Sequence, residues 1–302
     1  MRAPVRSTAS ATSPGIPYIA LVAAVFFGLA TVPAAAQTSD PKPPLPGERV
    51  AAGGPPPENK TRVSLGLATR YGPEFEGADE SEIAPFPIPL ITVRNFYRFN
   101  FTGRGLSFDL VRQRYDNGRL RLRMGPLVSA DFGRDEDDSD FLDGLGDVDT
   151  SVLAGGFVDV RYGPVALSVS GGQDIADGHD GARVDMRLGF MIPVGERLRL
   201  IPGISTTWAS EDYNQSFFGI TPTQAANSIY DTFDAESGFK DVGVNLNIRY
   251  KIADNRAATG IVSYKRLIGD AADSPIVQGP GGSEDQVSAL FGISYSFDFT
   301  TP

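Results

Sequence analysis

The sequence predicts an all-β fold, namely a transmembrane, antiparallel, up-and-down β-barrel of about 12 strands. In the stretch 286–299, the odd positions from Val287 are apolar and the even positions from Ser288 are mostly polar. A period of two gives a strand one apolar face and one polar face. Similar stretches recur along the chain, as in transmembrane barrels. Taken alone, the last stretch fits a strand of a soluble β-sandwich equally well, and the recurrence favours the barrel.

The N-terminal part predicts an exported protein. Residues 1–36 resemble a secretory signal peptide, with two arginines, an apolar run and three consecutive alanines that end at Ala36. A membrane anchor is the alternative, but the apolar run is short and is interrupted by Gly and Pro. Residues 37–61 are rich in Pro and predict a flexible periplasmic leader. Residues 62–302 then form the outer-membrane barrel, because no later run of 18 apolar residues could cross as a helix.

Twelve segments alternate apolar residues with Ser, Asn, Asp, Arg or Gly, and an even number suits a single-chain barrel. In the first half of the chain they lie at 62–71, 84–93, 97–101, 106–110, 120–124 and 148–162. In the second half they lie at 165–169, 184–190, 198–200, 242–250, 256–267 (a weaker pattern) and 287–299. The second segment contains three prolines, which cannot donate ladder hydrogen bonds, so a bent or irregular strand is expected there.

The connections between these segments sort by length. From a periplasmic start, the periplasmic turns are short: around Asn95 and at 115–118, 162–164, 193–196 and 253–255. The external loops are long, except for 102–104: they span 72–83, 131–147, 174–181, 208–239 and 268–285. Short turns inside and long loops outside are typical of outer-membrane barrels.

The polar strand faces carry charges of both signs, which are costly against lipid, so we expect them to face the lumen. The expected cations are Arg119, Arg121, Arg123, Arg183, Arg187, Arg197 and Arg199. Their expected anionic partners are Asp109, Asp149, Asp159, Asp185 and Asp241. A 12-stranded lumen crowded by such side chains predicts a narrow or plugged pore.

Composition excludes some functions. A net charge of −10 argues against nucleic-acid binding, which needs Lys and Arg for the phosphates. The absence of cysteine is compatible with an oxidising compartment. No nucleotide-binding glycine motif or zinc constellation is present, so we expect no cofactor, no metal site and no enzymatic activity.

Two loop features have alternative interpretations. The acidic loop 131–147 could bind Ca²⁺, but its spacing is not that of an EF-hand, and a solvated acidic loop is favoured. His179 is the only histidine. A Ser–His hydrolytic site is conceivable, but no serine adjoins His179, and an external loop residue without chemistry is favoured.

Three segments resemble motifs of the MipA/OmpV family of outer-membrane proteins. The first is 71–79, followed by the Pro-rich 85–89; the second is 216–220; and the third is 264–277. The residues we single out are Tyr71, Pro73, Gly77, Asp79, Ser216, Phe217, Phe218, Gly219, Tyr264, Arg266, Leu267, Gly269, Asp270, Asp273, Ser274 and Pro275.

The resemblance implies an outer-membrane barrel that contacts outer-membrane lipid, and it supplies no catalytic residues. In the family's namesake it implies a scaffold that links a lytic transglycosylase to a peptidoglycan synthase. Other members are described as adhesins or porin-like proteins. The expected function is therefore a scaffold for peptidoglycan-remodelling enzymes; the alternatives are a narrow channel for small solutes or a surface adhesin. The C-terminal strand is expected to be read by the barrel-assembly machinery.

Overall fold

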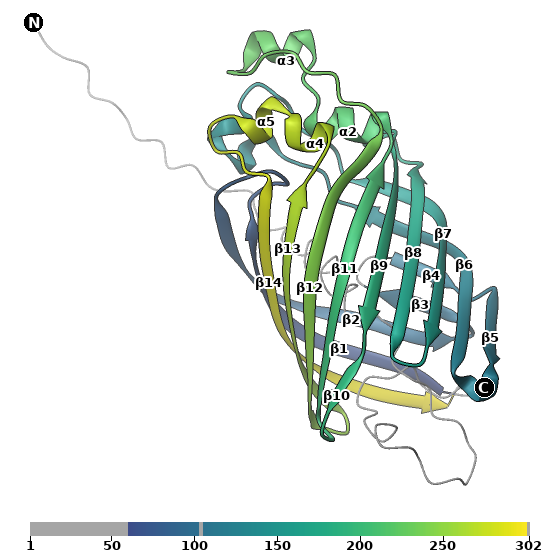
Figure 1. The fold of residues 1–302 in the computed structure, drawn as a ribbon. Coiled ribbons are helices and arrows are strands. Elements are labelled where there is room, and N and C mark those ends of the chain that lie inside the picture. The colour runs from purple at the N-terminus through teal and green to yellow at the C-terminus, as the bar shows by residue number, and fades with distance from the viewer. Residues whose placement is uncertain (1–59, 103–104, 301–302) are drawn as a thin grey trace, which may run out of the picture.

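The computed structural model describes residues 60–102 and 105–300, which form a closed antiparallel β-barrel (Figure 1). The first half of the sheet contains β1 (Lys60–Pro73), β2 (Ser81–Phe96), β3 (Phe99–Thr102), β4 (Gly105–Phe108), β5 (Val111–Tyr115), β6 (Leu120–Asp131) and β7 (Ser151–Tyr162). The second half contains β8 (Val165–Asp174), β9 (Ala182–Phe190), β10 (Ile192–Val194), β11 (Leu198–Ala209), β12 (Gly238–Ala253), β13 (Arg256–Leu267) and β14 (Asp285–Thr300).

The barrel has twelve strands, as predicted, because two strands are each interrupted once. β4 and β5 both pair with β6 and are two pieces of one strand. β9 and β10 both pair with β11 and form another. Each remaining strand pairs with its neighbours in sequence, and β1 closes the sheet on β14 from Lys60↔Thr300 to Tyr71↔Ala289. Closure thus leaves only the short β5 and β10, among the described strands, paired on a single side.

The alternation of side chains gives the barrel an apolar outside, as expected. Leu67, Val244 and Ile293 are more than half exposed, while Ala68, Asn247 and Ser294, which lie on the opposite faces of the same strands, are buried. Tyr97 and Tyr162 lie at the short-turn end and are also half exposed, as aromatic residues at a membrane interface would be.

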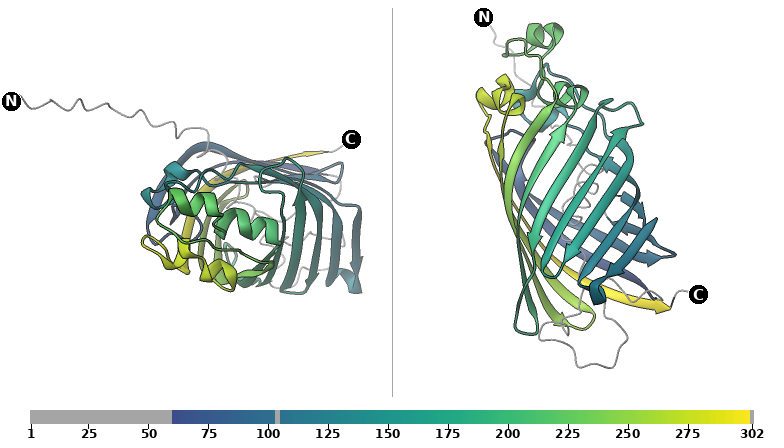
Figure 2. Two further views of the ribbon diagram at one scale, coloured as in Figure 1. Left: turned by 90° about the horizontal axis from the view of Figure 1, so that it is seen from above. Right: turned by 45° about the vertical axis from the view of Figure 1, so that its right-hand side comes forward.

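The two ends of the barrel differ in the way the sequence predicted. Tight turns join the strands at the end where β14 finishes, and longer segments with helices gather at the opposite end (Figures 1 and 2). The helices are α2 (Glu211–Phe218), α3 (Pro222–Asn227), α4 (Asp270–Asp273) and α5 (Pro275–Gln278). In residues 60–102 and 105–300, no helix is long and apolar enough to cross a membrane.

The strand predictions need several adjustments. β1 begins at Lys60, two residues before the expected start, and the predicted signal peptide and residues 37–59 of the leader lie outside the described residues. The Pro-rich β2 is irregular as expected, with a register shift opposite Gly66 and Ala68.

Three expected lumenal charges lie elsewhere. Arg119 and Arg197 are exposed in the short turns after β5 and β10, and Asp149 is exposed two residues before β7 begins. The alternation was extended beyond the strand ends, where the chain leaves the sheet and the period of two no longer determines direction.

Candidate functional site

The long loops fold into a cap over the extracellular mouth, comprising residues 74–80, 132–150, 175–181, 210–237 and 268–284 (Figure 2). Two apolar clusters hold the cap together. The first contains Ala209, Tyr213, Phe217, Phe218, Ala235, Leu267, Ala271, Ala272 and Val277. The second contains Phe75, Ala78, Leu142, Leu145, Ile220, Tyr230 and Ile276. Because both clusters join several loops, the cap is a packed structure with a core of its own.

Local sequence signals start the cap helices. The Ser210 side chain accepts a hydrogen bond from the Tyr213 N–H at the start of α2, and Thr221 forms a capping box with Gln224 at the start of α3. α2 then buries Tyr213, Phe217 and Phe218 on its inner side. The helix thus supplies the aromatic residues around which the other loops pack.

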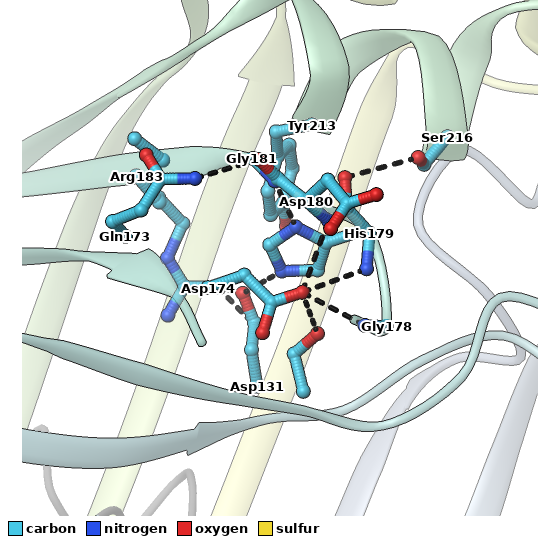
Figure 3. Close-up of polar contacts among 12 residues, drawn as sticks. Asp131, Gln173, Asp174, Gly178, His179, Asp180, Gly181, Arg183, Tyr213 and Ser216 are labelled. Atoms are coloured by element: carbon cyan, nitrogen blue, oxygen red, sulfur yellow. Dashed lines mark hydrogen bonds and ion pairs between the residues drawn. The ribbon is translucent and has the colours of Figure 1, made fainter. Parts of the chain in front are cut away.

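Asp174, at the end of β8, organises the loop that contains His179 (Figure 3). Its carboxylate accepts hydrogen bonds from the Ser151 hydroxyl at 2.8 Å and from the backbone N–H groups of Gly178 and His179, both at 2.9 Å. The N–H groups of residues 176 and 180 donate to the same carboxylate. One buried acid therefore satisfies most of the donors in a tight loop.

His179 lies in the expected loop between β8 and β9, and its side chain is buried there. Its ring packs edge-on against Tyr213, with 4.9 Å between centroids, and its Nδ1 accepts the Gly181 N–H at 3.0 Å. Nε2 faces Asp131 at 3.7 Å, beyond hydrogen-bond distance. The Ser216 hydroxyl donates to the carbonyls of Asp212 and His179, and neither contact involves the imidazole. The arrangement lacks the nucleophile–base contact of a hydrolytic site, and it fixes the loop against α2.

Asp131 and Arg183 form the principal ion pair beneath the cap. Arg183 Nη1 lies 2.7 Å from both carboxylate oxygens of Asp131, and Arg183 Nε lies 3.3 Å from Asp185. Burial raises the pKa of Tyr213 beyond its usual range, so the phenol beside this pair stays neutral.

A cavity of about 290 Å³ lies under the cap, between the loops and the upper lumen. Its charges are compensated. The buried Lys240 contacts Glu76 at 2.5 Å and Asp241 at 3.6 Å, and Lys265 contacts Asp241 at 3.2 Å. A charge-balanced cavity of this size, lined by apolar as well as polar groups, suits water or a small neutral solute better than a large oligosaccharide.

The acidic loop uses its carboxylates to cap its own backbone. Glu136 accepts the Gly146 N–H at 2.9 Å, Asp147 accepts the Glu136 N–H at 2.8 Å, and Asp135 caps a 3₁₀ turn. Within the described ranges, no group of three or more His, Asp or Glu residues is placed to hold a metal ion. Arg134 donates to the Phe217 carbonyl at 2.9 Å, and burial lowers the pKa of Arg134 to about 10. Arg134 therefore remains charged at neutral pH and ties this loop to α2.

The residues singled out by resemblance come together mainly in the cap. The Ser274 hydroxyl donates to the Phe218 carbonyl at 2.6 Å, and the Asp270 carboxylate accepts the Glu236 N–H at 2.6 Å. Phe217, Phe218 and Leu267 share one apolar cluster. Three segments that are far apart in the chain thus meet at the mouth.

Glycines and turn residues give the backbone the conformations that bring these segments together. Gly77 has φ +107°, and a Cβ there would lie 2.8 Å from Val277 Cγ2, so only glycine fits. Gly269, with φ +58°, precedes α4; Gly219 ends α2; and Pro275 begins α5. The Asp79 N–H donates to the Gly281 carbonyl, and the Asp273 N–H donates to the Gly269 carbonyl.

Four of the singled-out residues lie at the edge of the cap or outside it. Tyr71 is exposed on the outer face of β1, and Pro73 ends that strand, where its carbonyl accepts a hydrogen bond from Arg70. Tyr264 and Arg266 both bond the Asp285 carboxylate on the outside of the barrel, at 2.6 and 2.9 Å.

The sequence interpretation missed the Asp174 loop. Its signal was an aspartate at a strand end, followed by a run rich in Gly and Asp at 177–181. This composition is typical of a side chain that accepts hydrogen bonds from the next few backbone N–H groups.

A closed antiparallel sheet with an apolar outer surface, a charged lumen, short turns and long loops defines the class: this is a β-barrel protein of the outer membrane. A family model described as MltA-interacting protein MipA matches residues 65–297. The chain belongs to this family.

Relatives support the location in the outer membrane. The putative outer membrane protein YiaT of Escherichia coli (strain K12) is 22% identical over 78% of this chain and 92% of its own length. The MltA-interacting protein of the same organism is 25% identical over 64% of this chain and 75% of its own length. Among solved structures, the outer membrane channel DcaP of Acinetobacter baumannii is similar with a TM-score of 0.39 and 10% identity, over 79% of this chain and 96% of that one.

Proposed function

We propose that this protein is an outer-membrane scaffold that holds a peptidoglycan-cleaving lytic transglycosylase at the inner face of the membrane, and that a peptidoglycan synthase joins the same assembly. The observation that carries the proposal is membership of the MipA family, in which a relative is named for its interaction with MltA. No catalytic constellation among the described residues competes with this role.

The geometry favours the periplasmic rim as the contact surface. The opposite end is covered by a packed cap with two apolar clusters, which leaves little room for a wide pore. At the short-turn end, Arg98, Arg119 and Arg197 are exposed on three separate turns. Two of these turns also carry an exposed acid, Asp116 and Glu196, so the rim presents separate cations that can orient an acidic partner surface. Residues 37–59 precede this rim in sequence, and we propose them as a tether.

Capture of a purified lytic transglycosylase by the detergent-solubilised protein tests the proposal. We expect the triple variant Arg98→Glu, Arg119→Glu, Arg197→Glu to recover at least about tenfold less enzyme. Charges on the rim steer the enzyme towards the barrel and set the orientation in which it binds. Deletion of residues 37–59 measures the contribution of the tether.

Ile229→Ala is the matched control, since Ile229 is 69% exposed on the cap at the opposite end. Failure of the unaltered protein to recover the enzyme, or equal loss with the control, would exclude the rim as a scaffold surface. Solute conductance or cell binding without enzyme capture would instead favour the channel or the adhesin.

A further inference from the structure

One wall of the cavity under the cap is built from neutral polar side chains. Asn245 on β12 stands directly opposite Ser263 on β13, and Ser263 stands directly opposite Ser288 on β14. Ser205, on the neighbouring β11, lines the same cavity, and the four strands lie side by side (Figure 1). Side chains that oppose each other across a ladder have Cβ atoms about 4.5–5.5 Å apart. We call these four residues the polar wall.

The polar wall keeps its hydrogen-bonding capacity free. In the part of the chain that the structure describes, neither its hydroxyls nor its amide has a hydrogen-bond partner. Charged groups at the same cavity are instead occupied with one another: Arg183 contacts Asp131 at 2.7 Å, and Lys265 contacts Asp241 at 3.2 Å. A solute in this cavity therefore meets unpaired neutral groups beside paired charges.

The cap adds apolar rings and one further donor. Phe75, Tyr213 and Phe217 line the cavity from the cap, and Arg134 lines it as well. Arg134 Nη1 donates to the Phe217 carbonyl, whereas Arg134 Nε is buried and has no hydrogen-bond partner among residues 60–102 and 105–300. A buried donor without an acceptor is costly, so an acceptor on a bound solute would be favourable there. The cavity thus combines flat apolar surfaces with groups that donate and accept hydrogen bonds.

Apolar side chains form the next layer of the lumen, away from the cap. Ile261 and Leu290 follow Ser263 and Ser288 on the inner faces of their strands and stand directly opposite each other. Both are 3% exposed, and Ile201 on β11 is 6% exposed, so the lumen is filled around them. The cavity above this layer measures about 290 Å³, close to the lower limit of about 300 Å³ for small-molecule pockets. It has the size for one sugar ring and is too small for a chain of rings.

We propose that the cavity under the cap binds a small, neutral, polyhydroxylated solute of the monosaccharide class. Each hydroxyl of such a solute both donates and accepts hydrogen bonds, as the hydroxyls and the amide of the polar wall do. The carbon atoms of its ring present apolar faces to Phe75 and Phe217. A charged solute would have to compete with existing ion pairs such as Arg183–Asp131. The site is separate from the scaffold contact at the periplasmic rim.

Saturation-transfer NMR of the protein, solubilised in a detergent whose headgroup is not a sugar, tests the site with D-glucose and D-galactose as probes. We expect at least one of these monosaccharides to bind. Maltose, a disaccharide, and glycine betaine, a small zwitterion, are each expected to bind at least about tenfold more weakly. Monosaccharide binding changes little between low and high salt, because no net charges attract each other.

The double variant Ser263→Ala, Ser288→Ala removes two hydroxyls of the polar wall. We expect at least about tenfold weaker monosaccharide binding, while heat-resistant migration of the barrel on gels is retained, because neither hydroxyl bonds to another described residue. Ser294→Ala is the matched control and leaves binding unchanged, since Ser294 lies on the same face of β14, further from the cap and outside the cavity lining. If the double variant does not fold, Asn245→Ala carries the same expectation.

Absence of binding by both monosaccharides, or equal affinity for glycine betaine, would overturn the proposal. Unchanged affinity in the double variant would place the sugar elsewhere and would overturn it too. Equal affinity for maltose would contradict a closed site of single-ring size. Enzyme capture by the rim is measured separately, so that failure of either proposal leaves the other standing.

Discussion

At the residue scale, Asp174 shows how one buried carboxylate can determine the conformation of a loop. The loop 175–181 is short and rich in Gly and Asp, and it has few apolar side chains with which to pack. Its backbone N–H groups converge on Asp174 instead, and His179 fills the space between that loop and Tyr213. Loss of the carboxylate would leave one buried and three partly buried backbone donors without acceptors, which is costly.

We predict that Asp174→Ala detaches this loop from the cap. Each hydrogen bond to a charged acceptor contributes about 1.5–3 kcal/mol, so local stability should fall by at least about 2 kcal/mol. Hydrogen exchange of the amides of Gly178 and His179 should accelerate at least about tenfold. Ile175→Ala is the control, because Ile175 is 62% exposed. Unaltered protection in Asp174→Ala would show that the carboxylate does not organise the loop.

At the element scale, α2 is the centre of the cap. Phe218 is completely buried, and its carbonyl accepts the Ser274 hydroxyl from the loop that follows β13. Arg134, from the loop before β7, donates to the carbonyl of the neighbouring Phe217. One helix of eight residues therefore connects its own loop with two others.

We predict that Phe218→Ala loosens the cap while the barrel stays folded. Truncating a buried Phe costs about 3–5 kcal/mol, and here the loss falls on the apolar cluster that joins the cap loops. Surface protease should cut within 210–237 or 268–284, whereas heat-resistant migration of the barrel on gels is retained. The exposed Ile229→Ala serves as the comparison. Equal protease resistance in both variants would contradict a cap built on α2.

The strands were predictable and the cap was not, for a physical reason. A strand that crosses lipid must alternate apolar and polar side chains at every step. The pattern of a stretch such as 242–250 is therefore enough to predict a strand. The contacts of Phe218, Ser274 and Gly77 join loops distant in sequence, and no local period encodes them. The burial of His179 was not predicted, because its neighbours Gly178 and Asp180 are typical of exposed turns.

At the scale of the whole molecule, the barrel is polarised along its axis. The cap covers the outer end above a charge-balanced cavity. The opposite rim carries exposed arginines on three turns. The scaffold proposal therefore places the working surface at the periplasmic rim.

A membrane-spanning barrel requires that β12 and its neighbouring strands point their apolar side chains at the lipid and their polar side chains at the lumen. The chain has no cysteine, so single cysteines at each position from 242 to 247 can carry a spin label without background. In proteoliposomes, we expect accessibility to membrane-dissolved oxygen to peak at Val242, Val244 and Leu246 and to fall at Gly243, Asn245 and Asn247. A profile without a period of two, or with its maxima at Asn245 and Asn247, would contradict the account.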